Sequence, residues 1–183
     1  KGNQLLSAPI QLKINGKLYT VPGKFQVVKT TAQAVYFKTT GSVANLDFAI
    51  DGSVEYDGFL NMNFQYAPKN PAGATVTDLA LVIPMKEEFS KLVTYFKPGD
   101  TRAYSGKLVK PFVKDLINHP VFWVGDAECG LYWGADSLRG TRIAETENSL
   151  VVSPAANGKG AVATVKIVDR RFLLKGKRTF EFS

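Results

Sequence analysis

A regular alternation of apolar and polar residues is the feature that most constrains how this chain can fold. In residues 60–66, Leu, Met, Phe and Tyr at even positions alternate with Asn and Gln at odd positions. Residues 10–14 and 43–51 show the same period of two. Because successive side chains of a strand point to opposite faces, this pattern predicts strands with one buried face and one solvated face.

Short turn motifs separate these alternating segments. Asn-Gly at residues 15–16 lies between two such segments. This is the strongest short hairpin signal, because both central residues of a type I′ turn need a positive φ. Asp-Gly at residues 51–52 and at residues 57–58 predicts two further turns. Turns at this close spacing indicate an antiparallel meander.

One segment has the spacing of a helix. In residues 86–96, apolar side chains fall at i, i+3, i+4 and i+7, which is typical of a helical stripe. Residues 92–96 (LVTYF) nevertheless have strong β propensity. We therefore expect a short helix or turn that gives way to a strand.

The remaining chain predicts further strands separated by loops. Residues 67–73 (APKNPAG) form a proline-rich loop, and residues 161–169 and 177–183 are expected to form the last strand pair. No long helix alternates with the strands, which argues against an α/β fold. The sequence predicts one all-β domain spanning residues 1–183: a two-sheet antiparallel β-sandwich with about a dozen strands and at most one or two short helices.

Composition and charge exclude several classes of protein. The apolar runs are far shorter than the roughly 20 residues needed to cross a bilayer, so no membrane span is expected. The net charge is +7, but no nucleic-acid-binding motif accompanies the basic residues, and no nucleic acid partner is expected. One cysteine and one histidine exclude an internal disulfide and a multi-cysteine or histidine-rich metal site. No cofactor motif or metal site is predicted.

Residues 119–140 concentrate the least common side chains: both tryptophans, the only cysteine and the only histidine. Residues 121–124 and 131–133 are β-branched and aromatic, and a glycine-bounded turn separates them, so they predict a hairpin. Its aromatics, carboxylates and an arginine are candidates for glycan contact: Trp123, Asp126, Glu128, Tyr132, Trp133 and Arg139. The same residues equally fit a core hairpin with a solvated tip. Tyr132 and Trp133 are neighbours, so they must face opposite sides of the strand.

No catalytic residue is predicted. Cys129 and His119 flank one arm of the hairpin, but nothing in the sequence marks them as a nucleophile and its base. Glycoside hydrolysis requires paired carboxylates, and Asp126 with Glu128 gives only a shared loop.

The hairpin also resembles a known family. Trp-Val-Gly-Asp at 123–126, Gly-Leu-Tyr-Trp at 130–133, and the Asp-Ser pair and arginine that follow are similar to a segment in the N-terminal domain of glycoside hydrolase family 123-like proteins. The resemblance covers residues 76–183, with Val-Asp at 168–169 and Arg-Thr-Phe at 178–180 in the expected places. It implies a non-catalytic β-sandwich that precedes a catalytic (β/α)₈ barrel. In that family an Asp-Glu pair in the barrel acts with the acetamido group of the substrate. No adjacent Asp-Glu pair occurs in this sequence.

The expected function is therefore an accessory role. The resemblance implies an N-terminal accessory domain of a longer chain, which braces the C-terminal catalytic barrel of the same polypeptide and is not itself an enzyme. The hairpin side chains named above add glycan contact as a candidate second role. The alternative is an independent carbohydrate-binding module for glycans that contain N-acetylhexosamine. The chain stops within a predicted strand, which favours a fragment, and the expected location is secreted or periplasmic in a bacterium.

Overall fold

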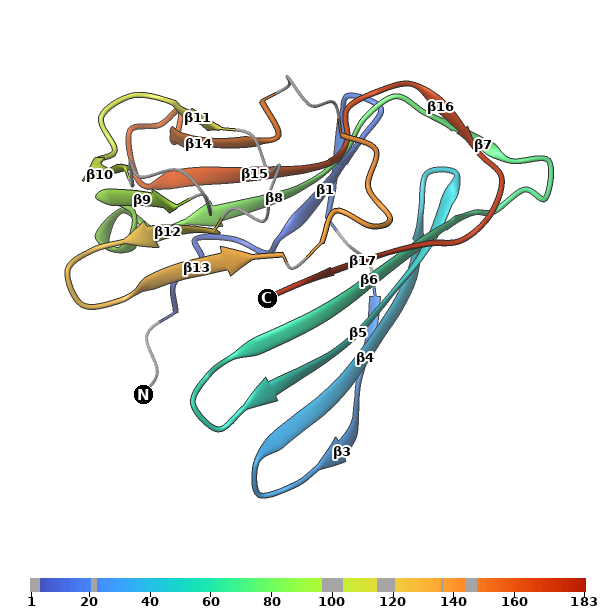
Figure 1. Ribbon diagram of the computed structural model, residues 1–183, viewed down its shortest axis with the longest axis horizontal. Helices are drawn as coiled ribbons and strands as arrows, with labels where there is room; N and C mark the ends of the chain where they lie inside the picture. The colour runs from blue at the N-terminus through green and yellow to red at the C-terminus, as the bar shows by residue number, and fades with distance from the viewer. Residues whose placement is uncertain (1–3, 21–22, 97–103, 115–120, 136, 144–147) are drawn as a thin grey trace.

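The computed structural model describes residues 4–20, 23–96, 104–114, 121–135, 137–143 and 148–183. These residues form antiparallel sheets and one short 3₁₀ turn, which confirms the all-β fold (Figure 1). Within this part of the chain, no helix is long and apolar enough to span a membrane.

The six-stranded sheet contains the most completely buried strands. Its order is β11 (Phe112–Lys114), β14 (Leu150–Pro154), β15 (Ala161–Val168), β8 (Leu79–Met85), β1 (Gln11–Ile14) and β2 (Lys17–Thr20). The predicted hairpin between β1 and β2 is confirmed, because Asn15 and Gly16 have φ values of 48° and 81°.

The four-stranded sheet carries the tryptophan hairpin. Its order is β10 (Tyr104–Lys107), β9 (Leu92–Phe96), β12 (Val121–Gly125) and β13 (Gly130–Gly134). A 3₁₀ turn at Glu87–Phe89 leads into β9, as the conflict between helical spacing and β propensity predicted. A separate pair joins β7 (Ala74–Val76) to β16 (Phe172–Leu174).

The five-stranded sheet contains the predicted meander. Its order is β17 (Arg178–Phe182), β6 (Leu60–Pro68), β5 (Leu46–Glu55), β4 (Ala34–Val43) and β3 (Gly23–Thr30). In Figure 1 the turns that join β3 to β4 and β5 to β6 extend toward the lower left, away from the other sheets. This sheet therefore projects beyond the part of the molecule that covers it.

The turn predicted at Asp51-Gly52 is wrong. Gly52 lies within β5, where it pairs with Phe37 of β4 and Met62 of β6. The chain instead turns at Ala44, whose φ is 52°. The ring of Phe37 lies over Gly52, and a Cβ at this glycine would be 2.5 Å from the Phe37 Cζ atom. A glycine inside a strand can thus make room for a neighbouring ring instead of ending the strand.

The predicted pairing of the last two strands is also wrong. β15 lies between β14 and β8, whereas β17 pairs with β6 in the five-stranded sheet. The described residues form 17 strands in four hydrogen-bonded sheets, which is consistent with the predicted sandwich-like β fold, although the prediction was about a dozen strands in two sheets. Strands that pair in this way are far apart in sequence, so the local pattern of residues does not reveal which strands pair.

The sheets are not isolated from one another, because Gly134 and Ser183 exchange backbone hydrogen bonds of 2.7 and 2.9 Å between the edges of β13 and β17.

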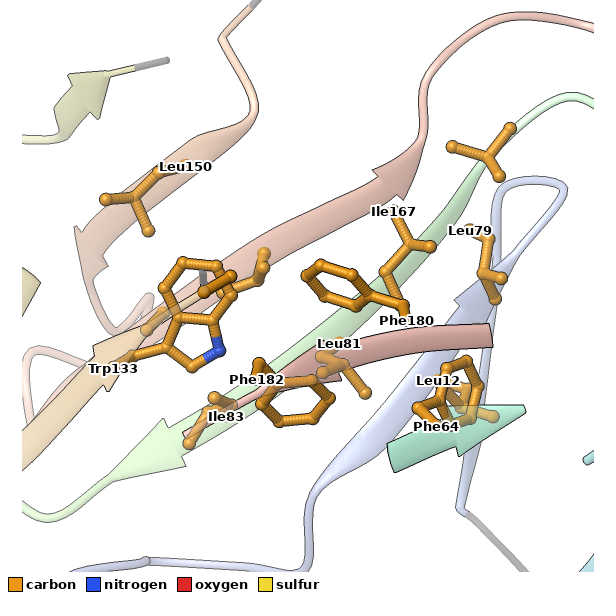
Figure 2. Packing of buried hydrophobic residues seen from close by; sticks show 14 of the residues in the cluster. Leu12, Phe64, Leu79, Leu81, Ile83, Trp133, Leu150, Ile167, Phe180 and Phe182 are labelled. Carbon is orange, nitrogen blue, oxygen red and sulfur yellow. The ribbon is translucent and has the colours of Figure 1, made fainter. Parts of the chain in front are cut away.

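Aromatic side chains fill the core where these edges meet. Trp133 packs against Phe122 at a centroid distance of 5.5 Å, and against Phe180 and Phe182 at 6.3 and 6.2 Å. Figure 2 shows the rings of Trp133, Phe180 and Phe182 beside Leu81 and Ile83 of β8 and Ile167 of β15. The rings therefore join the five-stranded sheet to the other two large sheets.

A substitution at Gly140 tests how tightly the loop after β13 packs on β17. Its φ is +86°, and an added Cβ would overlap the carbonyl oxygen of Thr179. We expect Gly140→Ala to lower the free energy of unfolding by about 3 kcal/mol or more, because steric overlap adds to the backbone strain. Gly158→Ala is the matched control, since Gly158 also has a positive φ of +71° but no atom lies within 4 Å of its added Cβ. The control should lose only about 1–2 kcal/mol. Urea denaturation measures the free energy of unfolding of both variants. Equal losses of stability in the two variants would contradict the close packing of Gly140 on Thr179.

Candidate functional site

The tryptophan hairpin separates its aromatic residues between two faces. Trp123 pairs with Tyr132, and Phe122 pairs with Trp133. Trp133 is 2% exposed and belongs to the core, whereas Tyr132 is 49% exposed. The prediction that Tyr132 and Trp133 face opposite sides is confirmed, and it is Trp133 that is buried.

Glycines hold the two outward rings against the sheet. The indole of Trp123 lies over Gly125 and Gly130, and a Cβ at Gly130 would be 2.7 Å from the Trp123 Cε2 atom. The ring of Tyr132 lies beside Gly134, where an added Cβ would be 3.1 Å from the hydroxyl oxygen. Any larger residue at these positions would displace the rings, so the glycines fix their placement.

The outward surface continues onto the neighbouring strands. Thr94 pairs with Trp123, and its hydroxyl lies 3.0 Å from the hydroxyl of Ser105 on β10. Phe96, two residues after Thr94 on β9, points to the same side and is 45% exposed. We call this surface the aromatic face: Phe96, Trp123, Tyr132, Thr94 and Ser105. It combines rings with hydroxyl groups.

The hairpin tip uses one of its carboxylates to hold the turn. Asp126 accepts hydrogen bonds of 2.9 Å from the backbone N–H groups of Glu128 and Cys129. These bonds, first that from Cys129, hold the pKa of Asp126 below its ordinary value, and Lys91 adds a smaller effect. Glu128 is exposed at the tip and Cys129 is half-buried. His119, the other member of the candidate Cys-His pair, lies outside the described residues.

Arg139 is placed in a different hollow. It lines a cavity of about 710 Å³ together with Lys177 and Arg178 at the start of β17. Arg178 donates to the Thr141 carbonyl at 3.2 Å, and its guanidinium lies 5.0 Å from the centre of the Phe172 ring. Burial of neighbouring Tyr66 raises the pKa of that phenol to about 12, although Arg178 acts to lower it.

The structure brings together only some of the residues predicted from sequence. Trp123 and Tyr132 lie side by side, and Asp126 and Glu128 lie at the adjacent tip. Trp133 and Arg139 are separated from them.

The sequence analysis missed a second surface, on the apolar side of the five-stranded sheet. Phe25, Val27 and Val54 are 63%, 55% and 39% exposed there. Phe25 stacks on Phe37 with their centroids 5.4 Å apart. We call this surface the open apolar face: Phe25, Val27, Phe37, Ile50, Val54, Leu60 and Met62. The alternation of residues predicted a buried side for these strands, but it could not reveal that part of that side lacks a cover within the described residues.

Acidic and sulfur ligands do not gather anywhere in the described chain. Among its described residues, no group of three or more His, Cys, Asp or Glu is close enough to hold a metal ion.

Comparison with known families identifies the family to which the chain belongs. A family described as glycoside hydrolase 123, third domain, matches residues 1–156. The chain belongs to this family. The match includes residues 1–75, which the hairpin motif left unassigned, and it contains the whole of the tryptophan hairpin. No curated protein and no solved structure gives a significant match.

The match confirms the relationship to glycoside hydrolase 123 and identifies this chain as a domain of a glycoside hydrolase. The description that matches is that of a third domain, whereas the motif resemblance implied an N-terminal one.

The turn at Asp126 predicts a pH dependence. Because folding lowers the pKa of this carboxyl, its contribution to stability is present above roughly pH 3.9, the ordinary Asp value, and is lost as the pH falls through the lower folded value. Asp126→Asn keeps an oxygen acceptor but cannot ionise. We expect the wild type to be more stable than Asp126→Asn at neutral pH, and the difference to shrink in acid. Urea denaturation at neutral and acidic pH measures this.

Glu128→Gln is the control for that measurement. It removes the same charge from the same tip, but the two backbone hydrogen bonds to Asp126 remain. A pH-dependent difference of equal size in both variants would show that net charge, and not the turn, is responsible.

Proposed function

We propose that this chain is a non-catalytic accessory domain that packs its open apolar face against a neighbouring domain of the same glycoside hydrolase polypeptide. The observation that carries the proposal is the exposure of Phe25, Val27 and Val54 on one continuous side of the five-stranded sheet. Monomeric proteins rarely expose contiguous apolar patches larger than a few hundred Å² unless a partner covers them.

The free energy gained by burying apolar side chains favours a domain that covers the open apolar face. Full burial of a Val or Phe side chain contributes about 1.5–3 kcal/mol. Val27 and Phe25 lie on β3, the edge strand of the sheet, and the ring of Phe37 continues the surface onto β4. A neighbouring domain that covered these side chains would remove from water an edge that otherwise favours aggregation.

The family description supports a partner within the same polypeptide, because a third domain accompanies other domains. The sequence also lacks the adjacent Asp-Glu pair that the resemblance places in the catalytic barrel. The barrel is therefore the proposed partner, and the accessory domain itself has no catalytic role. A position before the barrel and a secreted or periplasmic location stay predictions.

The open apolar face is tested by charge substitution. We expect Val27→Lys to weaken association of this domain with the flanking domains of its natural polypeptide, supplied as a separate chain, by about 2 kcal/mol, or roughly 30-fold. The reason is that a lysine ammonium would have to be desolvated at the contact. Isothermal titration calorimetry measures the affinity.

Val109→Lys is the matched control for the docking test. Val109 is 77% exposed in the connection between β10 and β11, outside the open apolar face, and its substitution should leave the affinity unchanged. A wild-type chain that instead forms a dimer, which Val27→Lys dissociates in analytical ultracentrifugation, would replace the proposed neighbour by a second copy.

A second candidate function is glycan contact at the aromatic face. It is favoured by the side-by-side placement of Trp123 and Tyr132, each with one ring face directed outward from a glycine floor. Sugar rings stack their apolar faces on such aromatics, while their hydroxyls bond to groups such as Thr94, Ser105 and the tip carboxylates. This would make the chain a carbohydrate-binding module for N-acetylhexosamine-containing glycans.

This second candidate predicts a specific loss of affinity. Tyr132→Ala should weaken binding of N-acetylhexosamine oligosaccharides about threefold to tenfold, through loss of one stacking contact. Tyr56→Ala is the matched control, since Tyr56 is 83% exposed at the β5–β6 turn of another sheet. Trp123 fluorescence in a Trp133→Phe background reports the binding. A fluorescence signal unchanged by saturating oligosaccharide would rule out this role.

A further inference from the structure

The polar side of the five-stranded sheet contains a hollow that neither the family match nor the hairpin motif predicts. Its volume is about 440 Å³, within the range of about 300–1,000 Å³ typical of small-ligand sites. All of its lining comes from β3 to β6 and the end of the chain at β17. We call it the polar groove. Its polar side chains are Tyr36, Asp51, Ser53, Asn61, Asn63, Glu181 and Ser183, and Val28, Phe37, Met62 and Phe182 also line it.

The strand register arranges these side chains in two neighbouring rows. In one row, Tyr36 pairs with Ser53, which pairs with Asn61. In the next row, Asp51 pairs with Asn63, which pairs with Glu181. Alternation along each strand directs both rows to the side opposite the buried Phe48 and Phe64.

Several of these groups are already held in position. Asp51 receives a hydrogen bond of 3.0 Å from Gln65 and lies 3.6 Å from the ammonium of Lys38. Asn61 donates to Glu55 at 3.4 Å. The ring of Tyr36 is 43% exposed, and the ammonium of Lys29 lies 5.9 Å from its centre. Neighbouring side chains therefore restrict the freedom of three of the lining residues, Tyr36, Asp51 and Asn61.

One group in the groove has an unmet bonding requirement. The Oδ1 atom of Asn63 is buried and has no hydrogen-bond partner among the described residues. A buried carbonyl oxygen without a partner is unfavourable, and native proteins leave few of them. Rotation of the amide exchanges its oxygen and its N–H₂ group, so Asn63 can offer an acceptor or two donors to a bound molecule.

The chemistry of these groups selects a neutral, hydroxyl-rich ligand. Carboxylates and amides accept hydrogen bonds from hydroxyls, the amides and Ser53 also donate, and a tyrosine ring offers a stacking surface. Asp51 is paired with Lys38, and the carboxylate of Glu181 disfavours an anionic ligand. A metal ion is not favoured, because within the described chain no three His, Cys, Asp or Glu residues come together.

We propose that the polar groove binds a neutral glycan through Tyr36, Asn61 and Asn63. The polar side chains of the groove point to the opposite side of the five-stranded sheet from the open apolar face, although Phe37 and Met62 belong to both linings. The groove is also formed by a different sheet from the aromatic face. The proposal therefore stands independently of both functions argued above.

Nuclear magnetic resonance titration of the isotope-labelled chain tests the proposal with maltohexaose, cellohexaose and chitohexaose as neutral probes. We expect at least one probe to shift the amide signals of Gly52, Ser53, Asn61 and Asn63. Tyr36→Ala and Asn61→Ala should each weaken that binding about threefold to tenfold, by loss of stacking or of hydrogen bonds. Val109→Ala is the control and should bind with unchanged affinity, since Val109 is 77% exposed between β10 and β11, outside both the polar groove and the aromatic face.

The other outcomes are also informative. Shifts confined to residues 94–96 and 121–133 would assign the glycan to the aromatic face and overturn the groove. If no probe shifts the amide signals of the groove at millimolar concentration, the proposal is overturned for neutral glycans. If a lysine-rich peptide binds more strongly than the sugars, the groove belongs to a cationic partner, and the glycan proposal is overturned as well. Retained circular dichroism spectra establish that the variants are folded.

Discussion

The packing of Trp133 against Phe180 and Phe182 is the interaction on which the arrangement of the molecule depends. It fixes the end of β17 beside β13, where Gly134 and Ser183 exchange backbone hydrogen bonds. Because β17 also pairs with β6, the same contacts anchor the five-stranded sheet to the rest of the core. Burial of Trp133 then directs its neighbours on the hairpin outward, and the aromatic face is a consequence of the core.

The five-stranded sheet shows how one element can offer two kinds of surface. Near β17 and β6 its apolar side is covered, as the complete burial of Phe180 and Phe64 shows. Toward β3 that cover ends, and Phe25 and Val27 are exposed. The other side of the sheet carries the polar groove. A partner domain and a small hydrophilic ligand could therefore bind to opposite sides of the same sheet.

Sequence reasoning succeeded where local geometry decides the outcome. Positive φ at Asn15-Gly16 and strict alternation in residues 60–66 led to the first hairpin and to β6. It failed at Asp51-Gly52, where the ring of Phe37 needs a residue without a side chain and the strand continues. It also grouped Arg139 with the hairpin, because proximity in sequence gives no information on the packing of Gly140 against Thr179, which carries Arg139 to another hollow.

The sequence by itself determined the all-β class, the tryptophan hairpin and the rule that Tyr132 and Trp133 face opposite ways, since these follow from backbone sterics and the period of a strand. The matching family added the relationship to glycoside hydrolases. Only the tertiary structure decided that Trp133 is the buried member, that β15 and β17 belong to different sheets, and that one apolar side is partly open. The reason is that strand pairing and burial depend on contacts between residues far apart in the chain, which a local pattern does not specify.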